Sequence, residues 1–417
     1  MNNFDYKKTI IVGVGFLGIS VVWPIFNQFI PIMLQAGNPV YEAQLLAAGQ
    51  DLPDFNGFGL SPALALFIMT WDNLINVFVQ PWVGEKSDRT WNRFGRRKGW
   101  ILLGVPIAMV GFVLIPFAQT AVSIAVYILI TNIGMSLFRS PAVAWLGDLY
   151  PPEERSQANG IINLMGGIGG LLAFFLGGYL FDAVGVAAPF ILGASLVIIA
   201  SAIVIRFVQE PEHIELDTAV PQSVLQNIKS IFNRPNKSGL YVLIAVLAWF
   251  MGFNALETGL SSFAVFSLGI PAGRAAIFAG VVTITFILFA VPAGIMGQRL
   301  GRRRAIMIGL VGLTFFLGSG TVFISNATTF MFVMVFVGIF WSLINVNGLP
   351  LVLDYGDEAR IGAYTGLFFF SSQLAAVLGP TLGGILVDIL NDEFRWLFLF
   401  SATFLAIAWL ILNQVEE

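Results

Sequence analysis

The chain has 417 residues, of which 57% are hydrophobic and only 11% are charged, and its mean hydropathy is +0.84. This composition is too apolar for a water-soluble protein of that length, so it implies the lipid bilayer as solvent and excludes a large soluble domain. The net charge of −3 indicates no particular partner, and the absence of cysteine excludes disulfides and thiol chemistry.

Apolar runs of about 20 residues recur along the chain, each long enough to cross a hydrocarbon core of roughly 30 Å as a helix. The runs are continuous and do not alternate with polar residues, which favours helices over the strands of a barrel. We predict twelve spans, at 10–34, 61–83, 99–119, 122–146, 157–181, 187–208, 240–268, 273–296, 305–325, 329–350, 362–388 and 395–413.

The basic residues give the predicted orientation. Of the 21 Lys and Arg residues, all but Arg139, Arg274 and Arg395 fall at the N-terminus or in the even-numbered loops. Positive residues concentrate on the cytoplasmic side of membrane proteins. We therefore expect an integral protein of the plasma (inner) membrane with both termini in the cytoplasm. The first run lacks a small-residue cleavage site and is interpreted as a retained helix.

Two connecting segments stand out. The acidic outside loop at 36–60 is interpreted as a solvated connector, with a small external cap as the alternative. Segment 209–238 contains three prolines and is interpreted as a cytoplasmic linker with one amphipathic helix near 224–232. His213, the chain's one histidine, lies in this linker, which favours a solvated residue over a proton relay.

An internal repeat divides the chain into two halves. The basic loop Arg93–Arg97 returns 206 residues later as Arg299–Arg303. The same offset relates Asp148 to Asp354, Gly160 to Gly366, Gly177-Gly178 to Gly383-Gly384 and Asp182 to Asp388. Repeats of this kind build secondary transporters. We predict an all-α membrane protein of two pseudo-symmetric six-helix bundles, 1–208 and 239–417, joined by the linker 209–238.

Three ionisable residues lie well inside the predicted spans: Asp72, Arg139 and Glu257. Each is costly at membrane depth unless it is paired or faces water, so each is a functional candidate, although a purely structural ion pair is the alternative. Asn76 and Gln80 follow Asp72 at intervals of four and form a polar stripe with it. Such a stripe can hold a proton or a hard cation. We assign cation or proton coupling to Asp72, Asn76, Gln80, Arg139 and Glu257.

Aromatic and amide residues recur on equivalent spans. Trp23 and Asn27 in the first span correspond to Trp249 and Asn254 in the seventh. Tryptophan can stack on the C–H face of a sugar while amides bond its hydroxyls, but packing inside the bundle explains the aromatic residues equally well. The predicted substrate-binding residues are Trp23, Asn27, Trp249, Asn254, Trp341, Asn345 and Gln373.

The loop from Gly84 to Arg97 resembles the signature loop of the major facilitator superfamily, and 297–303 is a degenerate copy without its acidic residue. With Arg139-Ser140-Pro141 and Ala158-Asn159-Gly160, the chain resembles the glycoside-pentoside-hexuronide:cation symporters, especially the proton-coupled sucrose and maltose branch. The resemblance implies sugar uptake by alternating access. It also implies a cytoplasmic gate made of Asp88, Arg89, Arg96, Arg97, Asp148, Glu154, Arg155, Asp354, Glu358 and Arg360.

The chain departs from the melibiose-type members, whose acidic pair on the second helix is replaced here by Asn76 and Gln80. One carboxylate, Asp72, suffices for a proton, whereas Na⁺ usually gathers several oxygen ligands. We therefore predict a sugar:H⁺ symporter, with Na⁺ less favoured. It would act as a monomer in the bilayer, without cofactor, metal or nucleic acid. The alternative is a transporter or exporter of lipid-like or drug-like amphipathic molecules. The absence of catalytic motifs argues against an enzyme.

Overall fold

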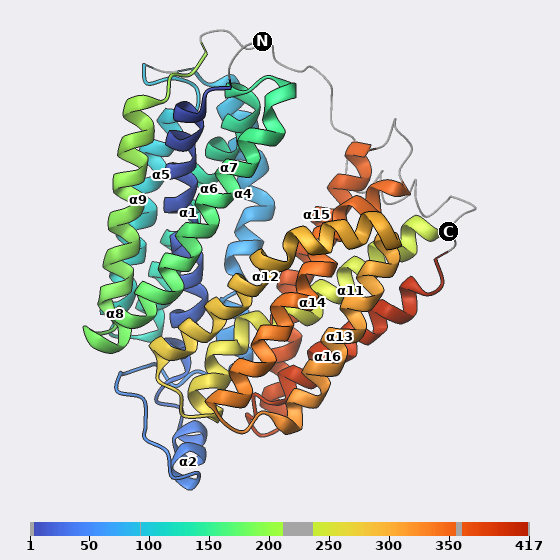
Figure 1. The fold of residues 1–417 in the computed structure, drawn as a ribbon. Helices are drawn as coiled ribbons and strands as arrows, with labels where there is room; N and C mark the ends of the chain where they lie inside the picture. The colour runs from blue at the N-terminus through green and yellow to red at the C-terminus, as the bar shows by residue number, and fades with distance from the viewer. Residues whose placement is uncertain (1–3, 92, 212–236, 356–360, 416–417) are drawn as a thin grey trace. The chain divides into compact units, whose positions relative to one another are not determined.

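The computed structural model describes residues 4–91, 93–211, 237–355 and 361–415. In this part of the chain the regular structure is helical, and twelve helices are long and apolar enough to cross a membrane. The chain forms two compact units (Figure 1). Unit 1 comprises Met1–Leu34, Trp71–Thr218 and Ala272–Ile277, and unit 2 comprises Gln35–Thr70, Ala219–Pro271 and Phe278–Glu417.

Unit 1 holds the first six spans, apart from the start of the second. In Figure 1 its helices run side by side as a bundle. They are α1 (Tyr6–Gln35), α4 (Trp71–Arg89), α5 (Lys98–Leu114) with the 3-10 turn η1 (Ile115–Phe117), α6 (Ala121–Leu149), α7 (Pro152–Leu172), the π turn η2 (Ala173–Gly177), α8 (Gly178–Ala183) and α9 (Ala187–Phe207). α6 begins with a reciprocal cap, in which Thr120 and Ser123 bond each other's backbone N–H groups.

Unit 2 holds the other six spans and part of the chain that follows α1. Its helices are α2 (Pro39–Ala47), α3 (Pro62–Ile68), α11 (Ser238–Ser262), the π turn η3 (Phe263–Ser267), α12 (Ala272–Leu300), α13 (Arg302–Phe323), α14 (Ala327–Asp354), α15 (Ile361–Ile389) and α16 (Trp396–Leu412). The first six residues of α12 belong to unit 1. Residues 35–70 thus group with unit 2, and residues 272–277 group with unit 1.

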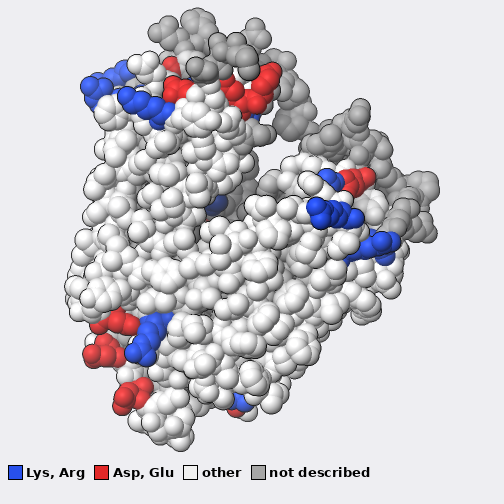
Figure 2. Space-filling view, in the orientation of Figure 1, with Lys and Arg blue, Asp and Glu red and all other residues white. Residues whose placement is uncertain are grey.

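The twelve predicted spans are confirmed, and each overlaps an observed span over most of its length. On the face shown in Figure 2, charged side chains gather near the helix ends and a broad band between them is almost free of charge, as a hydrocarbon core requires. We call the helix ends that carry the loops Arg93–Arg97 and Arg299–Arg303 the basic side, and the other ends the opposite side.

Close backbone contact holds neighbouring helices together, as in α5 and α6. A Cβ added to Gly134 would collide with the backbone nitrogen of Ala108, and one added to Gly104 would lie 2.8 Å from the carbonyl oxygen of Gly134. Small residues allow this approach, and it replaces the hydrophobic driving force that lipid does not supply.

The outside loop at 36–60 contains a helix, in contrast to the solvated connector favoured from sequence. Tyr41 of α2 is 1% exposed, and its ring stacks 4.7 Å from that of Phe266. Gln44 of the same helix donates a hydrogen bond to the carbonyl oxygen of Asn391 at 3.1 Å. These contacts fit the alternative, a cap on unit 2. The predicted linker helix at 224–232 and His213 lie outside the described residues.

Candidate functional site

A buried charge network lies on the basic side of unit 1. Arg96 donates to Asp88 at 2.8 Å, and Arg97 binds Asp88 at 2.5 Å and Asp148 at 2.8 Å. Arg97 is only 3% exposed. Burial by itself lowers the pKa of Arg97, but the hydrogen bond and charge of Asp148, with those of Asp88, raise it above its ordinary value. The guanidinium therefore stays charged, and the network ties the end of α4 to the end of α6.

Glu210 completes this network, although its position was assigned to the linker in the sequence. Its carboxylate accepts the backbone N–H groups of Arg96 at 2.5 Å, Arg97 at 3.1 Å and Lys98 at 2.9 Å. It also accepts the indole N–H of Trp145 at 2.9 Å. Since α5 begins at Lys98, Glu210 caps that helix with a negative charge at its positive end.

Gly95 has a structural role in the basic loop Arg93–Arg97. Its φ is +120°, in the left-handed region that favours glycine, and a Cβ there would collide with Oε2 of Glu210. The glycine thus leaves room for the carboxylate. In the sequence, an acid two residues after an apolar run and directly before Pro211 is the available signal for this contact.

Other predicted gate residues lie outside the network. Arg89 pairs with Glu85 at 3.3 Å on an exposed surface. Arg155 donates to the backbone carbonyls of Tyr150 and Gly147, both at 3.1 Å, so it caps the end of α6. Glu154 acts on the hydroxyl of Tyr150 only through its charge. Arg360 and Glu358 lie outside the described residues.

Unit 2 carries a reduced version of the network. Arg302 bonds the carboxylate of Asp354. The residues at the equivalent repeat positions, Arg96 and Asp148, form an ion pair at 3.9 Å. Arg303 instead donates to the backbone carbonyls of Leu412 at 2.9 Å and Asn413 at 3.2 Å, at the end of α16.

The membrane-embedded charges of unit 1 lie near each other. The guanidinium of Arg139 lies 5.6 Å from the centre of the Trp23 ring, and Asp72 acts on Arg139 electrostatically. Asn73 donates to the Asp72 carboxylate at 2.9 Å. Along the helix axis, Asp72 lies about 5 Å from the middle of its span, toward the opposite side. The charge of Asp72 thus acts on the Arg139 guanidinium within unit 1, and the coupling role of both residues stays a prediction.

The helices of unit 1 that carry Asp72 and Arg139 also carry amides and hydroxyls within their spans. Ser136 donates to Oδ1 of Asn76 at 2.6 Å, which joins α4 to α6. Asn132 is 1% exposed, and neither atom of its amide has a hydrogen-bond partner. Asn27 and Gln80 are partly exposed on their helices. Such buried amides need partners, and a bound polar molecule or water can supply them.

Unit 2 exposes polar residues within its spans. Glu257 of α11 and Asn345 of α14 are exposed, and Asn254 and Gln373 are partly exposed. Oε1 of Gln373 has no hydrogen-bond partner. Exposed acids and amides at this depth are far too costly to face lipid, so these side chains require water or a polar ligand.

The aromatic candidates of unit 2 pack inside it. Trp249 is fully buried, and a Cβ added to Gly348 would lie 3.3 Å from its Cζ2. Trp341 stacks on Phe253 with ring centres 3.7 Å apart. For these residues the burial favours the packing alternative over stacking on a sugar. Trp23 is partly exposed and stays a candidate for substrate contact.

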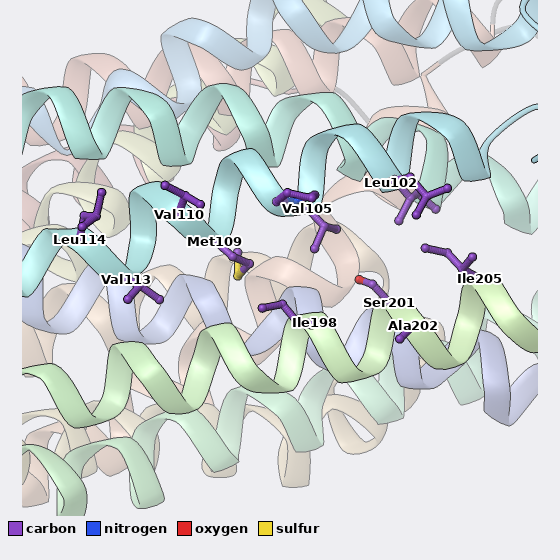
Figure 3. Close-up of a pocket in the computed structure, with 12 residues that line it drawn as sticks. Leu102, Val105, Met109, Val110, Val113, Leu114, Ile198, Ser201, Ala202 and Ile205 are labelled. Carbon is purple, nitrogen blue, oxygen red and sulfur yellow. The ribbon is translucent and has the colours of Figure 1, made fainter.

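An apolar groove of about 630 Å³ lies between α5 and α9 (Figure 3). Ser201 is the one polar side chain among the residues that line it, and the others include Leu102, Val105, Met109 and Ile198. The groove offers almost no hydrogen-bonding groups, so its chemistry suits an alkyl chain and does not suit a sugar.

Comparison with protein families matches the chain to the model of the Major Facilitator Superfamily over residues 9–287 and 266–416. The sucrose transport protein SUC3 of Arabidopsis thaliana is 26% identical over 147 residues, which cover 30% of this chain and 25% of that protein. The cis,cis-muconate transport protein of Acinetobacter baylyi is 21% identical over 273 residues, covering 64% of this chain and 66% of that protein.

Solved structures share the fold. The nucleoside transporter NupG matches with a TM-score of 0.73 at 14% identity, covering 100% of both chains. A bacterial homologue of the human lysosomal transporter Spinster matches with a TM-score of 0.72 at 13% identity, covering 99% of this chain and 98% of that one. These identities establish the shared fold alone. The chain matches only about a quarter of the length of the plant sucrose transporter.

Proposed function

Because the chain belongs to the major facilitator superfamily, whose members are transporters, we propose that it is a sugar:H⁺ symporter of the plasma membrane. Transport proceeds by alternating access, with the basic side in the cytoplasm. The observation that carries the proposal is the electrostatic interaction of Asp72 with Arg139 within the spans of unit 1, on helices that also carry the bonded pair Asn76 and Ser136.

The pair supports proton coupling. A protonated Asp72 releases Arg139, whose guanidinium then has N–H donors available for a substrate hydroxyl. Na⁺ would need several oxygen ligands. Oδ1 of Asn76 already accepts from Ser136, so it is less available to a cation. These contacts favour H⁺ over Na⁺.

The neutral amides support a sugar as substrate. Asn27, Asn254, Asn345 and Gln373 offer both donors and acceptors, as hydroxyl groups require. Relatives agree at low identity: besides the plant sucrose transporter, the mouse proton-associated sugar transporter A is 29% identical over 134 residues.

A second candidate function is transport or export of an amphipathic molecule. Two observations favour it: the apolar groove between α5 and α9, and a likeness to the multidrug resistance protein 3 of Bacillus subtilis, which is 25% identical over 256 residues. In that case Glu257, exposed on α11, would face a cationic or amphipathic substrate.

Proteoliposomes containing the purified chain and an internal pH dye test the proposal. Each sugar of a panel of mono- and disaccharides is added outside the vesicles, with no ion gradient imposed. At least one sugar should acidify the lumen faster than it does in empty vesicles. The same panel with a Na⁺ gradient identifies the coupling ion. If no sugar acidifies the lumen, and a pH gradient drives efflux of a lipophilic cation, the second candidate replaces the proposal.

A further inference from the structure

The apolar groove between α5 and α9 is about as long as one leaflet of the bilayer is thick. Both helices belong to unit 1. In Figure 3, Leu102 and Ile205 lie at one end of the groove and Leu114 lies at the other. The distance along the helix axis from Leu102 to Leu114 is about 18 Å, and half of a hydrocarbon core is about 15 Å. A single alkyl chain of one leaflet can therefore lie along the whole groove.

The groove is closed on the side of the bundle and open on the other side. Among its lining residues, Val105 and Met109 are buried, whereas Val110 and Ile198 are more than half exposed, at 57% and 51%. An unfilled groove would cost its buried lining van der Waals contacts. In a bilayer, the alkyl chains of lipids are the groups available to restore those contacts.

Small residues on α9 create the groove, and the equivalent helix of unit 2 does not have them. The buried positions of α9 recur 208 residues later on α16, as the pairs Phe190 and Phe398, Val197 and Leu405, Ala200 and Ala408, and Val204 and Leu412. In this register Ser201 and Ala202, which line the groove, correspond to Trp409 and Leu410. Unit 2 thus has large side chains where unit 1 keeps small ones, so the hollow is a feature of unit 1 and not of the repeat.

Two basic residues stand at the basic-side end of the groove, where α5 begins and α9 ends. Lys98 lies one turn before Leu102, and Arg206 lies one turn after Ala202, so each shares a helix face with a lining residue. Glu210 accepts the backbone N–H of Lys98, and among the described residues no carboxylate forms an ion pair with the side chain of Lys98 or Arg206. Both positive charges are therefore available to an anionic ligand.

Aromatic side chains indicate that this end of the groove lies at the membrane surface. Trp100 of α5 packs edge-on to Trp82 of α4, with ring centres 6.0 Å apart, and Trp82 is 52% exposed. Tryptophan is enriched at the level of the lipid headgroups. Basic residues between helix ends at this level suit a lipid phosphate. In the register of α16, Gln414 replaces Arg206, so this charge is also specific to unit 1.

We propose that the groove binds an anionic phospholipid of the basic-side leaflet, with one acyl chain along α5 and α9 and the phosphate against Lys98 and Arg206. Ser201 lies about 7.5 Å from Arg206 along the helix axis, and its hydroxyl can donate to an ester carbonyl between the phosphate and the chain. The lipid stays with unit 1 and is not the transported substrate. The inference goes beyond the proposed function and does not depend on the sugar or the proton.

Native mass spectrometry of the purified full-length chain tests the headgroup site. The protein in detergent receives equal amounts of phosphatidylglycerol and phosphatidylcholine with identical acyl chains. One bound phosphatidylglycerol should be retained about ten- to thirtyfold more often than phosphatidylcholine, because each basic residue favours an anionic lipid about fivefold. Lys98→Gln and Arg206→Gln should each lower this ratio about fivefold. Lys86→Gln, which removes an exposed charge of α4 on the same side, should leave it unchanged.

Substitutions inside the groove test the site of the acyl chain. Ser201→Trp installs the residue that α16 carries and should lower retention of phosphatidylglycerol about tenfold, because the ring occupies the place of the chain. Ala202→Leu, at an exposed position of the groove, should act in the same direction. Ile199→Trp is the matched control, since it adds the same ring at an exposed position of α9 that does not line the groove, and it should leave retention unchanged.

Equal retention of the two lipids by the unaltered chain would overturn the proposal. An effect of Lys86→Gln as large as that of Lys98→Gln would do so too, since it would show attraction to the whole basic surface. Unchanged retention in Ser201→Trp and Ala202→Leu would exclude the groove, and if Ser201→Trp does not fold, Ala202→Leu decides. Displacement of the lipid by an excess of a lipophilic cation would instead assign the groove to the amphipathic substrate of the second candidate. Failure of sugar-driven proton uptake would leave these results intact.

Discussion

The guanidinium of Arg139 lies over the ring of Trp23, 5.6 Å from its centre, on the face of unit 1 where Asp72 also acts on it. Arg139 therefore has one partner that can lose its charge by protonation and one that cannot. When Asp72 is protonated, the ring still orients the guanidinium, whose N–H groups are then free for a ligand.

We expect Arg139→Lys to weaken substrate binding about 5- to 30-fold, because an ammonium cannot donate a fork of hydrogen bonds and stack at once. Trp23→Leu should weaken binding by a similar factor and Trp23→Phe by less. Binding is measured by isothermal titration calorimetry with the transported sugar. Trp100→Phe, on α5 and edge-on to Trp82, is the matched control. Equal effects of the control and the site variants would show a general loss of packing.

Asp72→Asn should remove proton coupling. Asparagine keeps the size and polarity of the side chain but cannot carry the proton, so sugar-driven acidification should fall to the level of empty vesicles. Exchange of labelled for unlabelled sugar needs no net proton movement and should survive in part. Asp54→Asn, in the outside loop, controls for loss of a carboxylate. Undiminished acidification by Asp72→Asn would transfer the role to Glu257.

Trp249 should matter for stability more than for substrate binding. It is fully buried, with Phe250 and Gly348 beside it. Trp249→Ala should destabilise the protein by about 3 to 5 kcal/mol through the cavity it leaves. Trp249→Phe should cost less and leave the sugar affinity of the folded protein unchanged. A large loss of affinity in Trp249→Phe, with its melting temperature preserved, would restore the stacking role suggested by the sequence.

The spans and the repeat were predictable because the bilayer imposes both. A continuous apolar run of about 20 residues has few alternatives to a helix in lipid, and the offset that links Arg93 to Arg299 aligns the halves directly. The same offset relates the ion pair of Arg96 with Asp148 to that of Arg302 with Asp354. For these residues, the repeat seen in the sequence corresponds to a repeated contact in the structure.

Contacts between residues distant in sequence were not predictable. Glu210 bonds the backbone of Arg96 from 114 positions away, and no periodicity marks such a pair. Arg155 has the sequence position of a gate residue, yet its guanidinium donates to the backbone carbonyls of Tyr150 and Gly147 at the end of α6. Helix α2 is only nine residues long, and its position depends on packing of Tyr41 against Phe266, which hydropathy does not reveal.

Glu210→Ala should weaken the charge network on the basic side. The change leaves the N–H groups at the start of α5 and the indole of Trp145 without their acceptor. Loss of charged hydrogen bonds of this kind costs about 1.5 to 3 kcal/mol. Trp145→Phe removes a single bond to the same carboxylate and should cost less. Thermal unfolding in detergent measures both, and an equal cost for the two variants would assign the effect to the indole alone.

Asp392 should make stability depend on pH. Burial raises its pKa above the ordinary 3.8, and the charge of Asp388 raises it further. The folded state therefore binds this proton more tightly than the unfolded state. Ionisation of Asp392 thus lowers the stability of the fold as pH rises through the folded pKa, and this penalty is absent at a pH below the ordinary pKa.

Asp392→Asn keeps a residue that tolerates the left-handed φ of 60°. It should raise the melting temperature at pH 7 by roughly 1 to 2 °C and leave it unchanged near pH 3. The titratable groups that interact with Asp392 are Asp388 and Tyr41. Glu393→Gln, at the next position, is the control, and a gain for Asp392→Asn that persists at pH 3 would show that the backbone conformation, and not the charge, is responsible.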